Sequence, residues 1–121
     1  MAQTIDQAKT GGFENVAVIG FGLIGASFAA ALRAANPSAQ VMAVDTDLAT
    51  RVEAVNRGWA TATAAPDAAE FRAFIEDGCD LVVLATPVSV VEGYLKDLAE
   101  WGYRGIITDT ASTKSRIIEM A

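Results

Sequence analysis

Three glycines at a fixed spacing mark the first place in the chain where a ligand could be held. Gly20, Gly22 and Gly25 form a G-x-G-x-x-G pattern directly after the apolar run 16–19. The first glycine of such a pattern permits a tight turn, the second lets the backbone approach a pyrophosphate, and the third allows close packing of helix on strand. The pyrophosphate then lies on free amides at a helix N-terminus, where the helix dipole favours negative charge. The pattern therefore predicts a dinucleotide-binding turn.

An acidic residue follows at the distance that this chemistry requires. Asp45 ends the next apolar run, 20 residues beyond Gly25. Its carboxylate would accept hydrogen bonds from the adenosine ribose hydroxyls and repel a 2′-phosphate, which predicts NAD rather than NADP as the cofactor. Thr46 and Asp47 come next, and Arg51 is the only nearby cation. The alternative interpretation is a structural glycine turn with a surface aspartate.

Two later loops should face the same ligand, because ligands of a doubly wound sheet lie at the carboxyl ends of the strands. Ala85, Thr86 and Pro87 follow the fourth apolar run, and the polar loop 109–114 follows the fifth. Small and hydroxylated side chains there would let the ribose and nicotinamide approach. Ser112 is the candidate for the nicotinamide side. The alternative is that the hydroxylated residues of both loops only cap helices.

These residues need a scaffold, and short apolar runs alternate with helical patterns five times from residue 15 onward. This alternation predicts an α/β fold, a doubly wound parallel sheet of Rossmann type with helices on both faces, after a flexible leader over 1–14. Asp47 has the type and position of an N-cap, and Gly58 of a helix end. The expected strands are 16–19, 41–44, 59–63, 81–84 and 106–107, and the expected helices are 23–35, 47–57, 66–75, 88–100 and one that starts at Thr113.

Composition limits the possible functions. The 121 residues are 52% hydrophobic and 20% charged, which suits one folded domain. No apolar run reaches the roughly 18 to 20 residues of a membrane span, and residues 1–10 lack the apolar core of a secretory signal. The net charge of −6 argues against nucleic acid as a partner. A single cysteine suits a cytoplasmic protein, and the absence of histidine removes the commonest general base and transition-metal ligand, so no metal site is expected.

Three segments carry a more specific signature than the glycine pattern alone. They read V-A-V-I-G-F-G-L-I-G-A-S-F (16–28), D-L-V-V-L-A-T-P-V (80–88) and I-T-D-T-A-S-T-K (107–114). The chain from residue 15 to 121 thus resembles the nucleotide-binding half of prephenate dehydrogenase and of its arogenate-using relatives in tyrosine biosynthesis. The resemblance implies an oxidative decarboxylation. In that reaction a hydride leaves the ring carbon bearing the 4-hydroxyl of prephenate for the cofactor, and loss of carbon dioxide gives 4-hydroxyphenylpyruvate.

The resemblance also implies a role for each matched residue. The glycine turn would hold the pyrophosphate, the acidic residue the ribose, and the two later loops the cofactor cleft and the nicotinamide side with the substrate hydroxyl. The residues of the glycine turn are Gly20, Gly22, Leu23, Ile24 and Gly25, and the acidic residue is Asp45. The residues of the cofactor cleft are Ala85, Thr86 and Pro87, and the residue on the nicotinamide side is Ser112.

The chain departs from the family in one large respect. Family members carry a histidine shortly after the third segment that polarises or deprotonates the substrate hydroxyl, and they continue into a helical domain that forms the dimer and completes the substrate pocket. This sequence has no histidine and stops at Ala121. We therefore expect a cofactor domain truncated before the last strand and the helical domain, inactive alone and prone to form homo-oligomers. The alternatives are a free-standing NAD-sensing module, and a β-hydroxyacid-type dehydrogenase domain with another substrate.

Overall fold

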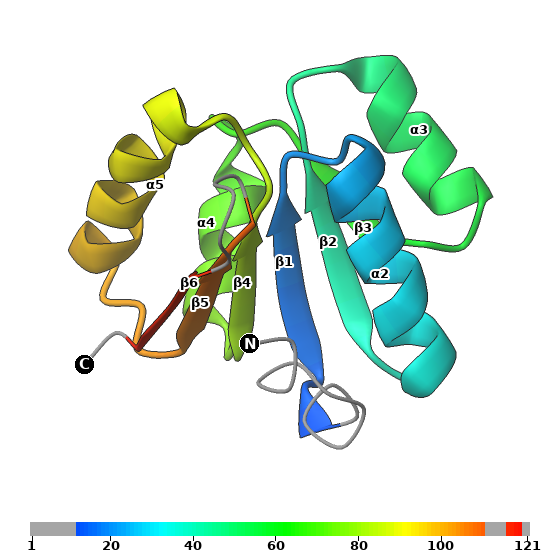
Figure 1. Cartoon of the computed structure of the whole chain (residues 1–121), viewed down its shortest axis with the longest axis horizontal. Coiled ribbons are helices and arrows are strands. Elements are labelled where there is room, and N and C mark those ends of the chain that lie inside the picture. Colours follow the sequence, from blue (N-terminus) through cyan, green and yellow to red (C-terminus); the bar gives the residue numbers. More distant parts are fainter. Residues whose placement is uncertain (1–11, 111–115, 120–121) are drawn as a thin grey trace.

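A six-stranded sheet forms the centre of the molecule in the computed structural model (Figure 1). The structure describes residues 12–110, with their side chains, and the backbone of 116–119. The strands are β1 (Asn15–Ile19), β2 (Gln40–Val44), β3 (Ala62–Ala64), β4 (Leu81–Leu84), β5 (Ile106–Asp109) and β6 (Arg116–Glu119). The helices are α2 (Leu23–Ala35), α3 (Leu48–Asn56), α4 (Ala69–Glu76) and α5 (Val88–Glu100).

The strand order is β3-β2-β1-β4-β5-β6, so the first strand of the chain lies inside the sheet and the chain winds outward from it in both directions. The pairs among the first five strands are parallel, and Ile19 lies level with Val44 on one side and Leu84 on the other. The expected doubly wound parallel arrangement is therefore confirmed for five strands. Because the order reverses at β1, a crevice opens between the ends of β1 and β4, which is where such sheets bind ligands.

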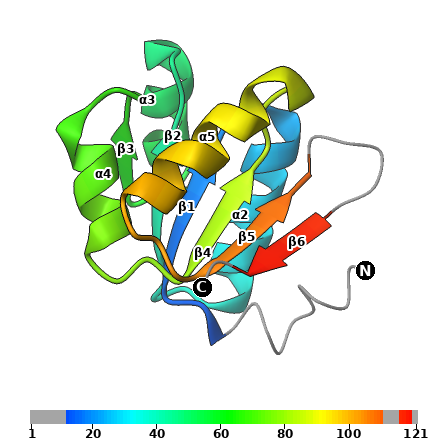
Figure 2. The ribbon, with the colours of Figure 1, turned by 90° about the vertical axis from the view of Figure 1, so that its left-hand side faces the viewer.

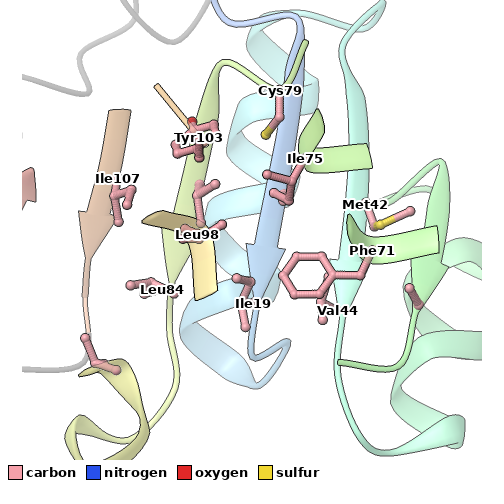
Figure 3. Close-up of a cluster of buried hydrophobic side chains, with 14 residues drawn as sticks. Ile19, Met42, Val44, Phe71, Ile75, Cys79, Leu84, Leu98, Tyr103 and Ile107 are labelled. Atoms are coloured by element: carbon pink, nitrogen blue, oxygen red, sulfur yellow. The ribbon is translucent and has the colours of Figure 1, made fainter. Parts of the chain in front are cut away.

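Helices cover both faces of the sheet, as Figure 2 shows with α5 in front and α2 behind. Alternate residues of each inner strand point to opposite faces. Ala17 and Ile19 of β1 join a core cluster with Phe71 of α4 and Leu98 of α5, which Figure 3 shows in part. The intervening residues of β1 pack instead with α2 and α3. The inner strands are buried on both sides, and this explains why they are continuously apolar.

Local sequence sets the ends of two helices as expected. The Asp47 carboxylate accepts the Thr50 amide at 3.0 Å and so caps α3. Gly58 and Gly78 follow α3 and α4 with φ of 75° and 87°, a left-handed conformation that favours glycine.

The expected helix beginning at Thr113 is wrong, because residues 116–119 form a strand. β6 pairs antiparallel with β5, with Ile107 level with Ile118. Two adjacent isoleucines favour a strand, and without β6 the backbone of β5 would form an open sheet edge. An antiparallel partner also needs only a short connection.

Two boundaries also differ from expectation. The third strand covers Ala62–Ala64 rather than 59–63, because the amides of Trp59 and Ala60 both bond to the Ala54 carbonyl and finish α3. The fourth helix begins at Ala69 rather than at 66, because residues 65–68 form a turn closed by the Ala68 amide on the Ala65 carbonyl.

Candidate functional site

The loops at the carboxyl ends of the strands are anchored to their neighbours. In each of four loops, an amide just beyond one strand bonds to the terminal carbonyl of an adjacent strand, so the sheet ladder extends into the loop. The turn backbone is therefore fixed before any ligand binds. The four bonds, each 2.8 to 3.2 Å long, run from Gly20 to Val44, from Ala85 to Ile19, from Asp45 to Ala64 and from Thr110 to Leu84.

A cleft of about 430 Å³ lies at this edge of the sheet. Six of the residues predicted from the sequence line it, together with five others. The predicted residues are Gly20, Gly22, Asp45, Ala85, Thr86 and Pro87, and the others are Val44, Thr46, Pro66, Val90 and Tyr94.

The remaining predicted residues are placed differently. Leu23 and Ile24 are exposed in the first turn of α2, with 85% and 56% of their surface accessible, and do not line the cleft. Any contact they make with a ligand would come through backbone amides. Ser112 lies outside the described residues.

Each glycine of the turn occupies a different environment. A Cβ on Gly20 would lie 2.8 Å from both the Ala85 carbonyl oxygen and the Thr86 methyl, and φ there is 87°. A Cβ on Gly25 would overlap the Gly20 carbonyl oxygen. A Cβ on Gly22 would meet nothing within 4 Å. Gly20 and Gly25 are thus required by the fold, whereas the space over Gly22 is open to a ligand.

The N-terminus of α2 suits an anion. Gly22 is the N-cap and offers no side chain to accept a hydrogen bond, and the first turn holds no acidic residue. The first amides of a helix have no partner within it. The arrangement therefore presents unneutralised N–H groups beside the cleft, which is the chemistry that binds phosphate.

The Asp45 carboxylate is held by backbone donors. One oxygen accepts the Phe21 amide at 2.8 Å and the other accepts the Asp47 amide at 2.9 Å. The carboxylate thereby joins the glycine turn to the loop after β2, and its oxygens keep lone pairs for further donors. Arg51 donates to the Asp45 backbone carbonyl at 2.7 Å, so this cation is held by the main chain beside the carboxylate.

Thr86 carries an unsatisfied hydroxyl. The residue is 9% exposed, and its Oγ1 atom has no hydrogen-bond partner in the part of the chain that the structure describes. A buried hydroxyl without a partner is costly, and such exceptions occur where a ligand supplies the missing bond. With the open space above Gly22, this atom fits a polar ligand in the cleft.

Five cleft residues were not predicted from the sequence. Val44 and Thr46 flank the predicted Asp45, whereas Pro66, Val90 and Tyr94 come from other parts of the chain. Tyr94 has helical spacing with Val91 and Leu98, which are buried, and this spacing favours a core position. Tyr94 is half-buried: it packs against the core cluster and also lines the cleft. Val90 lies four residues before Tyr94 and so on the same side of the helix. This spacing is visible in the sequence and is the signal that could have indicated both residues.

Burial raises the pKa of the Tyr94 phenol, and the negative charges of Asp45 and Asp97 raise it further. The phenol is therefore neutral at physiological pH and can donate a hydrogen bond.

Within the described residues, no three acidic, cysteine or histidine side chains gather as a metal-binding group. None of the helices in the described part of the chain has the length and apolar character required to cross a bilayer.

Comparison with known proteins gives a consistent result. Residues 28–121 match the family model of the prephenate dehydrogenase nucleotide-binding domain. A prephenate dehydrogenase from Lactococcus lactis subsp. cremoris is 31% identical over 113 residues, which are 89% of this chain and 29% of that protein. The crystal structure of prephenate dehydrogenase from A. aeolicus, in complex with hydroxyphenyl propionate and NAD+, has the same fold. Its TM-score is 0.63 at 24% identity, over 79% of this chain and 32% of that one.

The chain thus spans about a third of the length of these relatives. The matched range begins after the glycine turn, so the turn and the family model indicate the same kind of domain from different residues. The chain belongs to the family of prephenate dehydrogenase nucleotide-binding domains.

Proposed function

We propose that this chain binds NAD at the carboxyl edge of its sheet and serves as the cofactor half of a prephenate-oxidising enzyme. The observation that carries the proposal is one cleft that combines an open backbone at Gly22 with a Thr86 hydroxyl that has no partner among the described residues. Together they call for a ligand that brings both a phosphate and hydrogen-bonding hydroxyls. A dinucleotide has both.

The residues would divide the cofactor among them. The amides of Gly22, Leu23 and Ile24 would hold the pyrophosphate at the α2 N-terminus. Asp45, already fixed by the Phe21 amide, would accept the adenosine ribose hydroxyls. Thr86 would donate its hydroxyl to a polar atom of the cofactor.

The remaining assignments concern the nicotinamide end. Ala85 and Pro87 would line the cleft with little bulk, and Ser112 would stand on the nicotinamide side.

When bound, the nicotinamide ring accepts a hydride. In the proposed reaction the C–H bond at the hydroxyl-bearing ring carbon of prephenate breaks to supply that hydride, and the carboxylate leaves as carbon dioxide. The products are 4-hydroxyphenylpyruvate, carbon dioxide and the reduced cofactor.

The family resemblance assigns the acid–base step of this reaction to a histidine, and the sequence contains none. We therefore expect the 121-residue chain to bind cofactor and show no turnover alone. Mixing it with prephenate and NAD+, and following the absorbance of the reduced cofactor, tests this. Sustained turnover would overturn the expectation.

Cofactor preference tests the role of Asp45. Titration calorimetry should give tighter binding of NAD+ than of NADP+, because Asp45 repels a 2′-phosphate. Asp45→Ala should erode the difference and weaken NAD+ itself, since it also removes the acceptor of the Phe21 amide. Asp77→Ala, which changes an exposed carboxylate at the C-terminal end of α4 outside the cleft, is the matched control. Equal affinities for the two cofactors in the unsubstituted chain would refute the assignment.

A further inference from the structure

A second hollow adjoins the candidate cleft. It lies between α4 and α5, has a volume of about 570 Å³, and shares Pro66, Val90 and Tyr94 with the cleft. Its other lining residues are Asp67, Ala68, Ala69, Arg72, Gly93, Asp97 and Trp101. Tyr94 therefore stands where the cleft opens into this α4–α5 groove.

The charges of the groove disfavour phosphate and favour a group that donates hydrogen bonds. Asp67 and Asp97 place two carboxylates on its wall. Its cation, Arg72, is already engaged, because its Nε lies 2.8 Å from a Glu76 carboxylate oxygen and its guanidinium lies 5.8 Å from the Trp101 ring centre. A ring that carries hydrogen-bond donors, such as the amino group of a purine, suits such a wall.

The flat surfaces at the junction point to the same kind of ligand. Tyr94 presents an aromatic ring, and Val90 and Pro66 present apolar surface beside it. Val90 is 43% exposed, which is a large apolar surface to leave in water. Aromatic side chains stack on nucleobases because every base has a π-face.

We propose that Tyr94 is a specificity-determining residue that binds the base of the cofactor, holding a purine ring at the junction of the cleft and the α4–α5 groove. The proposal rests on the proposed dinucleotide-binding function and adds to it which side chain selects the adenosine end. Asp45 lines the same cleft as Tyr94 and lies close enough for its charge to act on the phenol, so a ribose held at Asp45 would place its base within reach of Tyr94.

The test is titration calorimetry with four ligands: NAD+, AMP, nicotinamide mononucleotide and ribose 5-phosphate. The variants are Tyr94→Leu, which removes the ring and keeps apolar volume, and Tyr94→Phe, which removes only the hydroxyl. Lys96→Ala is the control, because this exposed residue of the same helix lines neither hollow.

We expect Tyr94→Leu to weaken NAD+ and AMP on the order of tenfold, which is within the range for loss of one base–aromatic stack. Nicotinamide mononucleotide should be unaffected. Tyr94→Phe should retain most of the affinity, and Lys96→Ala all of it. Unchanged AMP affinity in Tyr94→Leu would overturn the proposal, as would an equal loss for nicotinamide mononucleotide.

The unsubstituted chain provides a test that needs no variant. AMP should bind more tightly than ribose 5-phosphate, and equal affinities would overturn the role given to the base. A chain that binds no NAD+ would refute the proposed function as a whole. A chain that binds NAD+ with no contribution from the base or from Tyr94 would refute this inference alone.

Discussion

Each oxygen of the Asp45 carboxylate accepts a backbone N–H from a different loop, one at Phe21 and one at Asp47. The residue that we propose as the ribose acceptor thus also holds the glycine turn in position. Its pairing with the turn crosses 24 positions of sequence, and no local pattern reveals it. The spacing from Gly25 to Asp45 predicts that the glycine turn and the acidic residue lie together, and the bond from the Phe21 amide joins the carboxylate to the turn.

Thr86 permits a prediction in which stability and binding change in opposite directions. Thr86→Val keeps the shape of the side chain and removes a buried hydroxyl that has no partner among the described residues. The free energy of unfolding should therefore rise by about 1 kcal/mol, as measured by urea denaturation. NAD+ affinity should fall several-fold in calorimetry, because the hydroxyl no longer donates to the cofactor. Unchanged NAD+ affinity in a stabilised variant would contradict the contact.

In the strand–turn–helix unit from β1 to α2, two glycines are required by the fold and one, Gly22, is open to a ligand. Gly25→Ala should lower the free energy of unfolding by about 2 to 3 kcal/mol, since the new methyl overlaps the Gly20 carbonyl oxygen. Gly22→Ala adds a methyl in open space. It should change stability by less than about 1 kcal/mol, yet abolish measurable NAD+ binding.

Thermal melts measure the stability of Gly25→Ala and Gly22→Ala, and calorimetry measures their NAD+ affinity. Each variant is the control for the other. If Gly22→Ala bound NAD+ normally, the pyrophosphate would not lie over this residue. If Gly25→Ala were as stable as the unsubstituted chain, close packing of α2 on β1 would not depend on the glycine.

Elements with strong local signals agreed with the sequence analysis. β1, β2 and β4 are apolar because both faces are covered, and Gly58 and Gly78 end their helices by adopting positive φ. The prediction that was wrong concerns a short segment whose residues suit either a helix or a strand. The segment 116–119 holds two isoleucines between charged residues, a pattern short enough for a helix turn or a strand. Pairing with β5 decides between them, and that depends on the sheet edge rather than on the segment itself.

At the scale of the whole molecule, uncovered apolar side chains predict self-association. Leu48, Val52 and Val55 are 64%, 50% and 46% exposed and share one face of α3 by their spacing. Leu23 and Val88 are exposed at the ends of their helices near the cleft. Light scattering should show a mass that increases with protein concentration, because contact between copies would bury this surface. Val52→Glu should reduce the increase, and a monomer at the highest concentration would contradict the prediction.

The buried pair Cys79 and Tyr103 predicts a loss of stability in alkali. Burial raises the pKa of the Cys79 thiol from 9.0 to about 12, and burial also raises the pKa of the Tyr103 phenol. Above pH 9 the unfolded chain loses the thiol proton while the folded chain keeps it. The unfolded state then binds fewer protons, so the free energy of unfolding falls by about 1 kcal/mol per pH unit between pH 9 and 12.

Urea denaturation at pH 9, 10 and 11 measures this slope. Cys79→Ala should flatten the fall between pH 9 and 10, where the thiol titrates alone in the unfolded chain, whereas Tyr103 adds its part above pH 10. If Cys79→Ala left the fall in the free energy of unfolding with pH unchanged, the Cys79 thiol would not be its cause.

The amino-acid sequence by itself determined the repeating strand–helix order, the glycine turn and its acidic partner, because these depend on local periodicity, φ angles and residue type. It also determined that no histidine can act as a base within this chain. Only the tertiary structure decided the strand order, the antiparallel edge strand β6 and the bond from Phe21 to Asp45. It also placed Tyr94 at the mouth of the α4–α5 groove. The strand order, the bond from Phe21 to Asp45 and the position of Tyr94 require segments distant in the chain to meet, and β6 requires the edge of β5 to be in place. The contact energy of all four therefore appears only once the sheet has formed.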